Sequence, residues 1–191
     1  MTGLRIEGNG PTLNATQRLR IIRVEGVMTM TDSIERQVLL NATIERVWQA
    51  ISDSAQFGRW FGARFDGPFE AGQRVAASMV PTEVDADVAR SQEPYAGMRF
   101  YVWVERVEPP RHLSFRWQPG AEVSGDPASL TGTTLVNFHL EEAPGGTRLT
   151  IRETGFDTIP LERRARAFAD NEQGWEIQAT LIAKYLAAHD A

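Results

Sequence analysis

Hydrophobic and polar residues alternate along several short stretches between residues 33 and 154. In SIERQVLL, residues 33–40, the apolar residues Ile34, Val38 and Leu40 fall on one side of the chain, which is the pattern of a half-buried strand. Similar patterns predict further strands, which lie within residues 73–80, 98–110, 111–117, 133–142 and 146–154. Short turn-rich connections between the later strands favour an antiparallel meander.

A helical period replaces the alternation in NATIERVWQAIS, residues 41–52. Apolar residues recur there at spacings of three and four, and either Asn41 or Thr43 can serve as the N-cap. A second helix is predicted for residues 160–188, and Gly174 is expected to divide it into a short helix and a long one. Its apolar stripe consists of Phe168, Trp175, Ala179, Ile182 and Leu186. The order of elements predicts an α+β fold with helices on one face of an antiparallel sheet.

Two segments between the predicted elements stand apart. FGRWFGARFDGPF, residues 57–69, carries five aromatic residues, and its three glycines argue against a helix. These aromatic side chains can form a small core that fills the gap between the sheet and a helix. Residues 81–97 are predicted to be an acidic, irregular loop, which is either a solvated loop tip or a lid that turns Tyr95 inward.

The first 32 residues show no sustained hydrophobic period and are predicted to be a disordered extension, followed by one domain over residues 33–191. We expect translation to begin at Met28 or Met30. The alternative is that residues 1–32 contain a strand or helix that docks on the domain.

Composition excludes several function classes. The 191 residues carry a formal net charge of -5 and show no run of basic residues, which argues against nucleic-acid binding. The chain has no cysteine and no apolar stretch long enough to span a membrane, so we expect a cytoplasmic protein. The three histidines do not have the spacing of a metal site, and no motif for a nucleotide or another cofactor is present.

Several motifs together resemble a known family. They are ATIERVW at residues 42–48, the Trp60-Phe61 pair, Gly146-Thr147, Gly155-Phe156 and Gly174-Trp175. Over residues 33–188 the sequence resembles the bacterial homologues of the activator of the heat-shock-protein-90 ATPase, within the START-like (SRPBCC) superfamily. The resemblance implies a helix-grip fold, in which a curved antiparallel sheet wraps around a long C-terminal helix and a cavity opens between them. It also implies that residues 57–69 belong to a short connecting helix and a loop, with their aromatic side chains at the mouth of that cavity. It also implies a link to the stress response.

Strand phase makes Glu153 the main candidate for polar chemistry. In GTRLTIRET, Leu149 and Ile151 alternate with polar residues, which places Glu153 in phase with the inward face. Glu153 then acts as a general base or as the polar anchor of a ligand. In the alternative, which we prefer, the strand ends before residue 153 and Glu153 pairs with an arginine at the rim.

Three functions follow from these patterns. The first is non-enzymatic binding of a small hydrophobic or aromatic molecule in the cavity. The second is binding of a protein partner, such as a chaperone ATPase that the domain modulates. The third is a cyclase or lyase that uses Glu153 or His139 with Tyr95. The sequence does not indicate the oligomeric state. The predicted ligand-binding residues are Trp48, Trp60, Phe61, Tyr95, Phe115, Trp117, Phe138, Glu153, Trp175, Gln178, Ala179 and Ile182.

Overall fold

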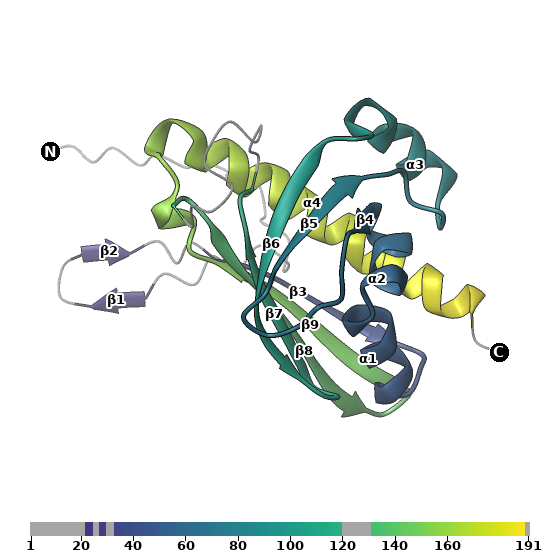
Figure 1. The fold of residues 1–191 in the computed structure, drawn as a ribbon. Helices are drawn as coiled ribbons and strands as arrows, with labels where there is room; N and C mark the ends of the chain where they lie inside the picture. Colours follow the sequence, from purple (N-terminus) through teal and green to yellow (C-terminus); the bar gives the residue numbers. More distant parts are fainter. Residues whose placement is uncertain (1–21, 25–26, 30–32, 120–130, 190–191) are drawn as a thin grey trace, which may run out of the picture. The chain divides into compact units, whose positions relative to one another are not determined.

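The computed structural model describes residues 22–24, 27–29, 33–119 and 131–189 (Figure 1). The chain divides into two units, Met1–Thr31 and Asp32–Ala191. In the first unit, β1 (Ile22–Val24) pairs with β2 (Val27–Thr29) in an antiparallel hairpin. These strands fall in the segment that was predicted to be disordered, and the rest of that segment lies outside the described residues.

The second unit is built on a curved, seven-stranded antiparallel sheet with the order β3-β9-β8-β7-β6-β5-β4. Its strands are β3 (Ser33–Leu40), β4 (Ala63–Phe65), β5 (Arg74–Met79), β6 (Arg99–Glu108), β7 (His112–Trp117), β8 (Thr134–Ala143) and β9 (Gly146–Thr154). Strands β5 to β9 form the predicted meander, and β3 closes the order by pairing with β9. The sequence pattern did not predict the short strand β4.

The helices are α1 (Ile44–Ser52), α2 (Ser54–Phe61), α3 (Ala86–Gln92) and α4 (Leu161–Ala188), with short 3-10 turns η1 (Glu93–Tyr95) and η2 (Phe156–Thr158). Figure 1 shows the long helix α4 crossing one face of the sheet, with α1 and α2 beside its C-terminal half. The α+β helix-grip fold is therefore confirmed. Helix α4 is continuous through Gly174, so the predicted break there is wrong.

Helix α2 is the short connecting helix that the family resemblance implies, and it corrects the argument that glycine keeps this segment from being helical. Asp53 caps this helix by accepting hydrogen bonds from the backbone N–H groups of Ala55 and Gln56, both at 2.9 Å. A Cβ atom on Gly58 would lie 2.2 Å from the carbonyl oxygen of Ala63. Glycine at this position therefore lets α2 and β4 approach closely, a tertiary requirement that outweighs its low helix propensity.

The segment 81–97 also differs from the prediction, because it contains α3 and η1 rather than an irregular loop. The side chain of Asp85 caps α3 through the backbone N–H groups of Asp87 and Val88. Lys184 on α4 donates to the same carboxylate at 2.5 Å. Tyr95 is 55% exposed, so it does not turn inward as the lid interpretation requires.

The core lies between the sheet and the helices. Strand β6 contributes Val102 and Val104, which are 1% and 2% exposed, and this settles which face of that strand points inward. The aromatic residues Phe57 and Trp60 are both fully buried, and the indole N–H of Trp60 donates to the carbonyl of Ala50 at 2.9 Å. They belong to the centre of the core rather than to the mouth of a cavity.

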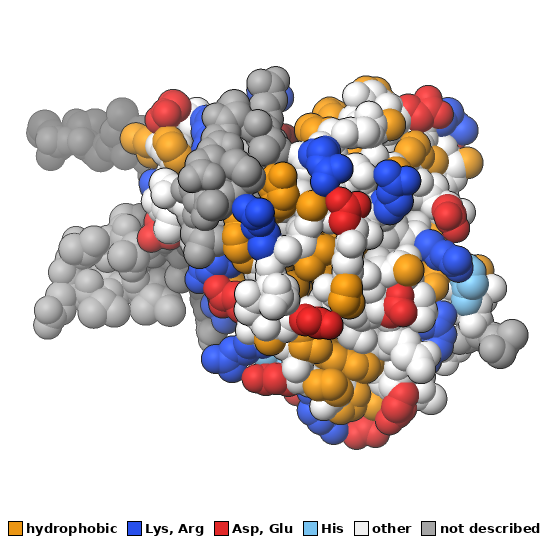
Figure 2. All heavy atoms as spheres, in the orientation of Figure 1, with side chains coloured by type: hydrophobic (Ala, Val, Ile, Leu, Met, Phe, Trp, Pro, Cys, Tyr) orange, Lys and Arg blue, Asp and Glu red, His pale blue; other side chains and the backbone are white. Residues whose placement is uncertain are grey.

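Acidic and basic side chains are interspersed over the face shown in Figure 2. Basic side chains form no single continuous patch among the described residues of that face. This distribution differs from the clustered positive charge that tracks a phosphate backbone.

Candidate functional site

Glu153 points into the interior from strand β9. It follows Leu149 and Ile151 on the inward face, and all three side chains are at most 1% exposed. The preferred interpretation, in which the strand has ended and Glu153 pairs with an arginine at the rim, is therefore wrong. The strand extends to Thr154 because β9 is paired on both sides, with β3 and with β8.

Four side chains donate hydrogen bonds to the Glu153 carboxylate. The indole N–H of Trp117 lies 2.8 Å from Oε1 and that of Trp175 lies 2.5 Å from Oε2. The hydroxyl of Thr134 donates to Oε1 at 2.5 Å. The amide nitrogen of Asn171 lies 2.9 Å from Oε1 and 3.0 Å from Oε2. These five residues, Glu153 with its four donors, are called the Glu153 cluster below.

The charge of Glu153 has no ionic counterpart in the cluster. Among the residues that the structure describes, Glu153 is the only buried acidic or basic side chain. None of the ion pairs formed by the described residues includes it. A carboxylate removed from water costs several kcal/mol of solvation even after relaxation. Here neutral hydrogen-bond donors alone offset that cost.

Aromatic rings enclose the cluster. The ring centroids of Trp117 and Trp175 are 5.6 Å apart, and Phe61 lies 6.0 Å from the first and 6.2 Å from the second. Phe138 packs at 5.8 Å on the other side of Trp175. The carboxylate thus lies in a setting of low polarity in which any electrostatic interaction is stronger than it is in water.

Helix α4 supplies Asn171 and Trp175 to the cluster from one of its faces. The two residues are four positions apart, so their side chains lie one above the other. Trp117 comes from the end of β7 and Thr134 from the start of β8, which are paired with each other at this position. The cluster therefore joins three neighbouring strands to the helix that covers them.

Several other predicted site residues lie close to these rings. Phe115 is buried and contacts both Trp117 and Phe138, with ring centroids 6.2 and 5.8 Å apart. Gln178 on α4 donates to the carbonyl of Phe61 at 3.0 Å. Ala179 is half-buried and Ile182 is fully buried on the same helix.

The structure does not bring the remaining predicted residues to the cluster. Trp48 packs against the core from α1, and Trp60 is held by its bond to the Ala50 carbonyl. Tyr95 is exposed on η1, and His139 is exposed on the outward face of β8. Glu153, His139 and Tyr95, which the cyclase or lyase hypothesis combines, therefore do not form one site.

Thr134 and Asn171 are the functional candidates that sequence analysis missed. Thr134 lies two and four residues before the buried residues Val136 and Phe138, so strand alternation places it on the same face. Asn171 lies four residues before Trp175, which puts it on the inward face of the predicted helix. Both signals were available, but polar residues at the ends of apolar patterns do not reveal their partner.

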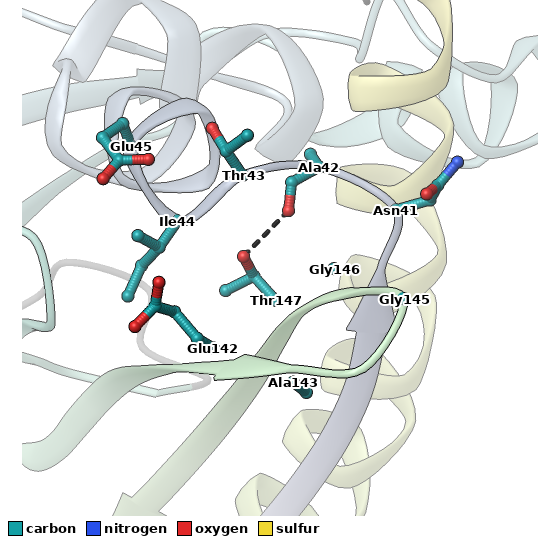
Figure 3. A pocket seen from close by; sticks show the side chains of 10 residues that line it. All are labelled: Asn41, Ala42, Thr43, Ile44, Glu45, Glu142, Ala143, Gly145, Gly146 and Thr147. Carbon is teal, nitrogen blue, oxygen red and sulfur yellow. Dashed lines mark hydrogen bonds between the residues drawn. The ribbon is translucent and has the colours of Figure 1, made fainter.

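Two open pockets lie away from this interior. The first, of about 580 Å³, lies where the N-terminus of α1 meets the turn between β8 and β9 (Figure 3). The hydroxyl of Thr147 donates to the carbonyl of Ala42 across it at 2.8 Å, and Glu45 and Glu142 flank it. A Cβ atom on Gly146 would lie 2.0 Å from the carbonyl oxygen of Leu40, so the pocket reflects the close packing of this turn against β3.

The second pocket, of about 650 Å³, lies on the outward face of the sheet. His112 lines this pocket. Its Nε2 atom lies 3.0 Å from the Asn137 side-chain oxygen, and its Nδ1 atom lies 3.4 Å from a carboxylate oxygen of Glu108. His139 is directly across from it on β8. Neither pocket contains a predicted ligand-binding residue.

Other kinds of site find no support in the part of the chain that the structure describes. No group of three or more histidine or acidic side chains is arranged to hold a metal ion there. Within the same ranges, no helix is long and apolar enough to cross a membrane.

Comparison with known proteins agrees with this fold. The family model described as Activator of Hsp90 ATPase homolog 1-like protein matches residues 41–187. No curated protein matches the sequence.

Solved structures of similar fold come from several bacteria. The Mesorhizobium loti protein MLL2253 is 22% identical, with a TM-score of 0.61 over 83% of this chain and 99% of its own. A protein from Arthrobacter aurescens is 25% identical, with a TM-score of 0.62 over 83% of this chain and 87% of its own. DynU16, from the dynemicin biosynthetic locus, is 22% identical with a TM-score of 0.57, and the match spans 82% of this chain and 47% of DynU16.

Proposed function

Since this chain belongs to the family of Activator of Hsp90 ATPase homolog 1-like proteins, we propose that it binds a small aromatic molecule between the sheet and α4 without transforming it. Glu153 is the polar anchor, and Phe61, Trp117 and Trp175 are the aromatic walls. An apolar site with a few placed polar groups is the usual composition of a small-molecule site.

The observation that carries this proposal is the unpaired charge of Glu153. The inward positions before it on β9 are the apolar residues Leu149 and Ile151. An apolar residue at position 153 would continue that pattern without burying a charge. The presence of a carboxylate at position 153 is explained if its charge binds a group of a ligand, because the described part of the chain supplies no opposite charge there.

We place the entry of a ligand on the side of Trp117 and Asn171. These two members of the cluster are half-buried, whereas Glu153, Thr134 and Trp175 are at most 2% exposed. The rings of Trp117 and Trp175 already contact each other, so a ligand must separate them. Binding therefore requires side-chain rearrangement, which is common at binding sites even when the backbone moves little.

A thermal-shift screen tests this function. The full chain is heated with members of a panel of small aromatic compounds that differ in charge, and a ligand at about 100 times its Kd should stabilise the fold by about 2.7 kcal/mol. For a chain of this length that raises Tm by roughly 5 to 10 °C. Trp175→Phe, which removes one donor of the cluster, should reduce the ligand-induced shift.

Trp103→Phe is the matched control for this screen. Trp103 lies on β6 opposite Arg116, on the outward face of the sheet, so its substitution should leave the ligand-induced shift unchanged. A panel without any stabilising compound, or equal losses in both variants, would count against a ligand site in the interior.

A second candidate function is the binding of a protein partner, which the family description supports through its reference to a chaperone ATPase. Tyr95 and Met98, just before β6, are 55% and 40% exposed, and a partner that covers them would remove apolar surface from water. The test is the ATP hydrolysis rate of a purified Hsp90-type chaperone with the wild-type chain and with the Tyr95→Ser, Met98→Ser variant. An unchanged rate with the wild-type chain would remove this candidate.

A further inference from the structure

Two separate acceptors lie along the inward face of α4, Glu153 from β9 at one end and Gln178 of α4 at the other, with Trp175 between them. Asn171, Trp175 and Gln178 follow one another at spacings of four and three residues, so they lie along one face of the helix. With a rise of about 1.5 Å per residue, positions 171 and 178 are about 10 Å apart along the helix axis. Asn171 contacts Glu153 at one end, and Gln178 marks the other.

The first end calls for a positively charged donor. Glu153 carries the charge, and its described partners are all neutral. Asn171 uses one amide group for both carboxylate oxygens, at 2.9 and 3.0 Å. Because it is half-buried, it is the member of the cluster that an incoming donor can most readily replace. An ammonium group there would add the attraction between opposite charges, which the neutral Asn171 amide does not provide.

The second end has an acceptor without a donor. The Gln178 amide nitrogen donates to the carbonyl of Phe61 at 3.0 Å, which fixes the orientation of the amide. The Gln178 side-chain oxygen is buried and has no hydrogen-bond partner among the described residues. An unsatisfied buried acceptor costs about 1 to 3 kcal/mol, and a ligand hydroxyl or N–H would satisfy it.

The ring of Trp175 connects the two ends. It packs against Phe61 and Trp117 at 6.2 and 5.6 Å between centroids, so a flat ring inserted here would have aromatic partners on more than one side. An aromatic wall beside a carboxylate also favours a cation, because a cation is attracted to the face of an aromatic ring.

We infer that the ligand is an elongated aromatic amine: its ammonium binds Glu153 in place of the Asn171 amide, and a hydroxyl or N–H at its far end donates to the Gln178 oxygen. This inference rests on the proposed function, because it names the class of ligand that the same interior accepts. The inference adds the requirement that the ligand carries two hydrogen-bond donors at opposite ends of an aromatic ring, and that one of these donors is charged.

Four probe molecules of similar size separate the two requirements. Tyramine has an ammonium and a phenolic hydroxyl, 2-phenylethylamine has the ammonium alone, and 4-ethylphenol has the hydroxyl alone. 3-(4-Hydroxyphenyl)propanoate has the hydroxyl with a carboxylate in place of the ammonium. Binding to the full chain is followed by tryptophan fluorescence, excited where the phenols do not absorb.

We expect tyramine to bind at least tenfold more tightly than either single-donor probe, and the carboxylate probe to bind most weakly. Glu153→Gln should remove the advantage of tyramine over 4-ethylphenol. Gln178→Met, which keeps the length of the side chain, should remove its advantage over 2-phenylethylamine. Asn171→Ala vacates the place of the ammonium, so tyramine affinity should be kept or increased.

The ranking of the four probes on the wild-type chain needs no variant to fold. If the carboxylate probe binds as tightly as tyramine, or if all four bind equally, the inference is overturned while the proposed function stands. Loss of tyramine binding in Asn171→Ala would also overturn it. If none of the four changes the fluorescence at millimolar concentration, the inference is overturned, and the thermal-shift panel decides separately whether the proposed function stands.

Discussion

Replacing Glu153 by glutamine tests whether the neutral donors of the cluster stabilise its carboxylate. The substitution keeps the size of the side chain and removes one acceptor and the charge. Oε1 accepts from three donors and Oε2 from two, so the glutamine oxygen should occupy the position of Oε1. Its NH2 group then faces the indole N–H of Trp175, which is 2% exposed.

The magnitude follows from that one mismatched contact. Asn171 can turn its amide to accept from the glutamine, but an indole N–H can only donate. A buried donor without an acceptor costs about 1 to 3 kcal/mol. At about 2 to 4 °C per kcal/mol for a chain of this length, Glu153→Gln should lower Tm by roughly 2 to 12 °C.

The assay is far-UV circular dichroism at neutral pH, during heating and during urea unfolding. Glu141→Gln is the matched control, because the Glu141 side chain is 51% exposed on β8, and its substitution should change stability by no more than about 0.5 kcal/mol. If Glu153→Gln is as stable as the wild type or more stable, desolvation of the charge outweighs the five hydrogen bonds, and the reasoning is refuted.

Two further predictions concern stability. The pKa of Asp85 is lowered from 3.8 to about 2, mainly by the hydrogen bond from Lys184 and then by the one from the backbone N–H of Val88. The stabilisation from this carboxylate is therefore complete above pH 3.8 and is lost as the pH falls through about 2. Asp85→Asn keeps the helix cap, and its Tm deficit should therefore shrink between about pH 4 and pH 2; a deficit that does not change with pH would contradict the ion pair. Gly58→Ala should destabilise the fold by several kcal/mol, because the added Cβ would lie 2.2 Å from the Ala63 carbonyl oxygen. Gly174→Ala should instead stabilise α4 by up to about 1 kcal/mol, because no atom lies within 4 Å of the added Cβ. Equal urea midpoints for the two glycine variants would contradict this difference.

The fold was predictable from sequence wherever a periodic pattern spanned a whole element. Alternation in residues 146–154 determined which side chains of β9 face inward, and the spacing of apolar residues in α1 located that helix. The sequence offered Asn41 or Thr43 as its N-cap, and the structure shows Thr43. Helix α3 was missed because ADVARSQ buries none of its side chains, so it has no apolar period to detect. The residue pattern alone argued against helix α2, which only the family resemblance implied, because the close approach of Gly58 to Ala63 is a tertiary contact.

The candidate site was predictable only in part, for a related reason. The phase of β9 indicated that Glu153 could face inward, but whether a carboxylate at that position is buried depends on its donors. Those donors come from β7, β8 and α4, between 18 and 36 residues away in sequence. A one-dimensional pattern identifies which face a residue occupies, but it does not identify the partners that meet there.

The most direct test of the central claim is the ¹H–¹⁵N NMR spectrum of the five tryptophan indole groups during titration with tyramine. If the ligand binds at the Glu153 cluster, the indole N–H signals of Trp117 and Trp175 should shift most, because both donate to the carboxylate. The Trp60 signal should change little, because that N–H donates to the Ala50 carbonyl. Unchanged Trp117 and Trp175 signals at millimolar tyramine would contradict the binding of an aromatic amine at the Glu153 cluster.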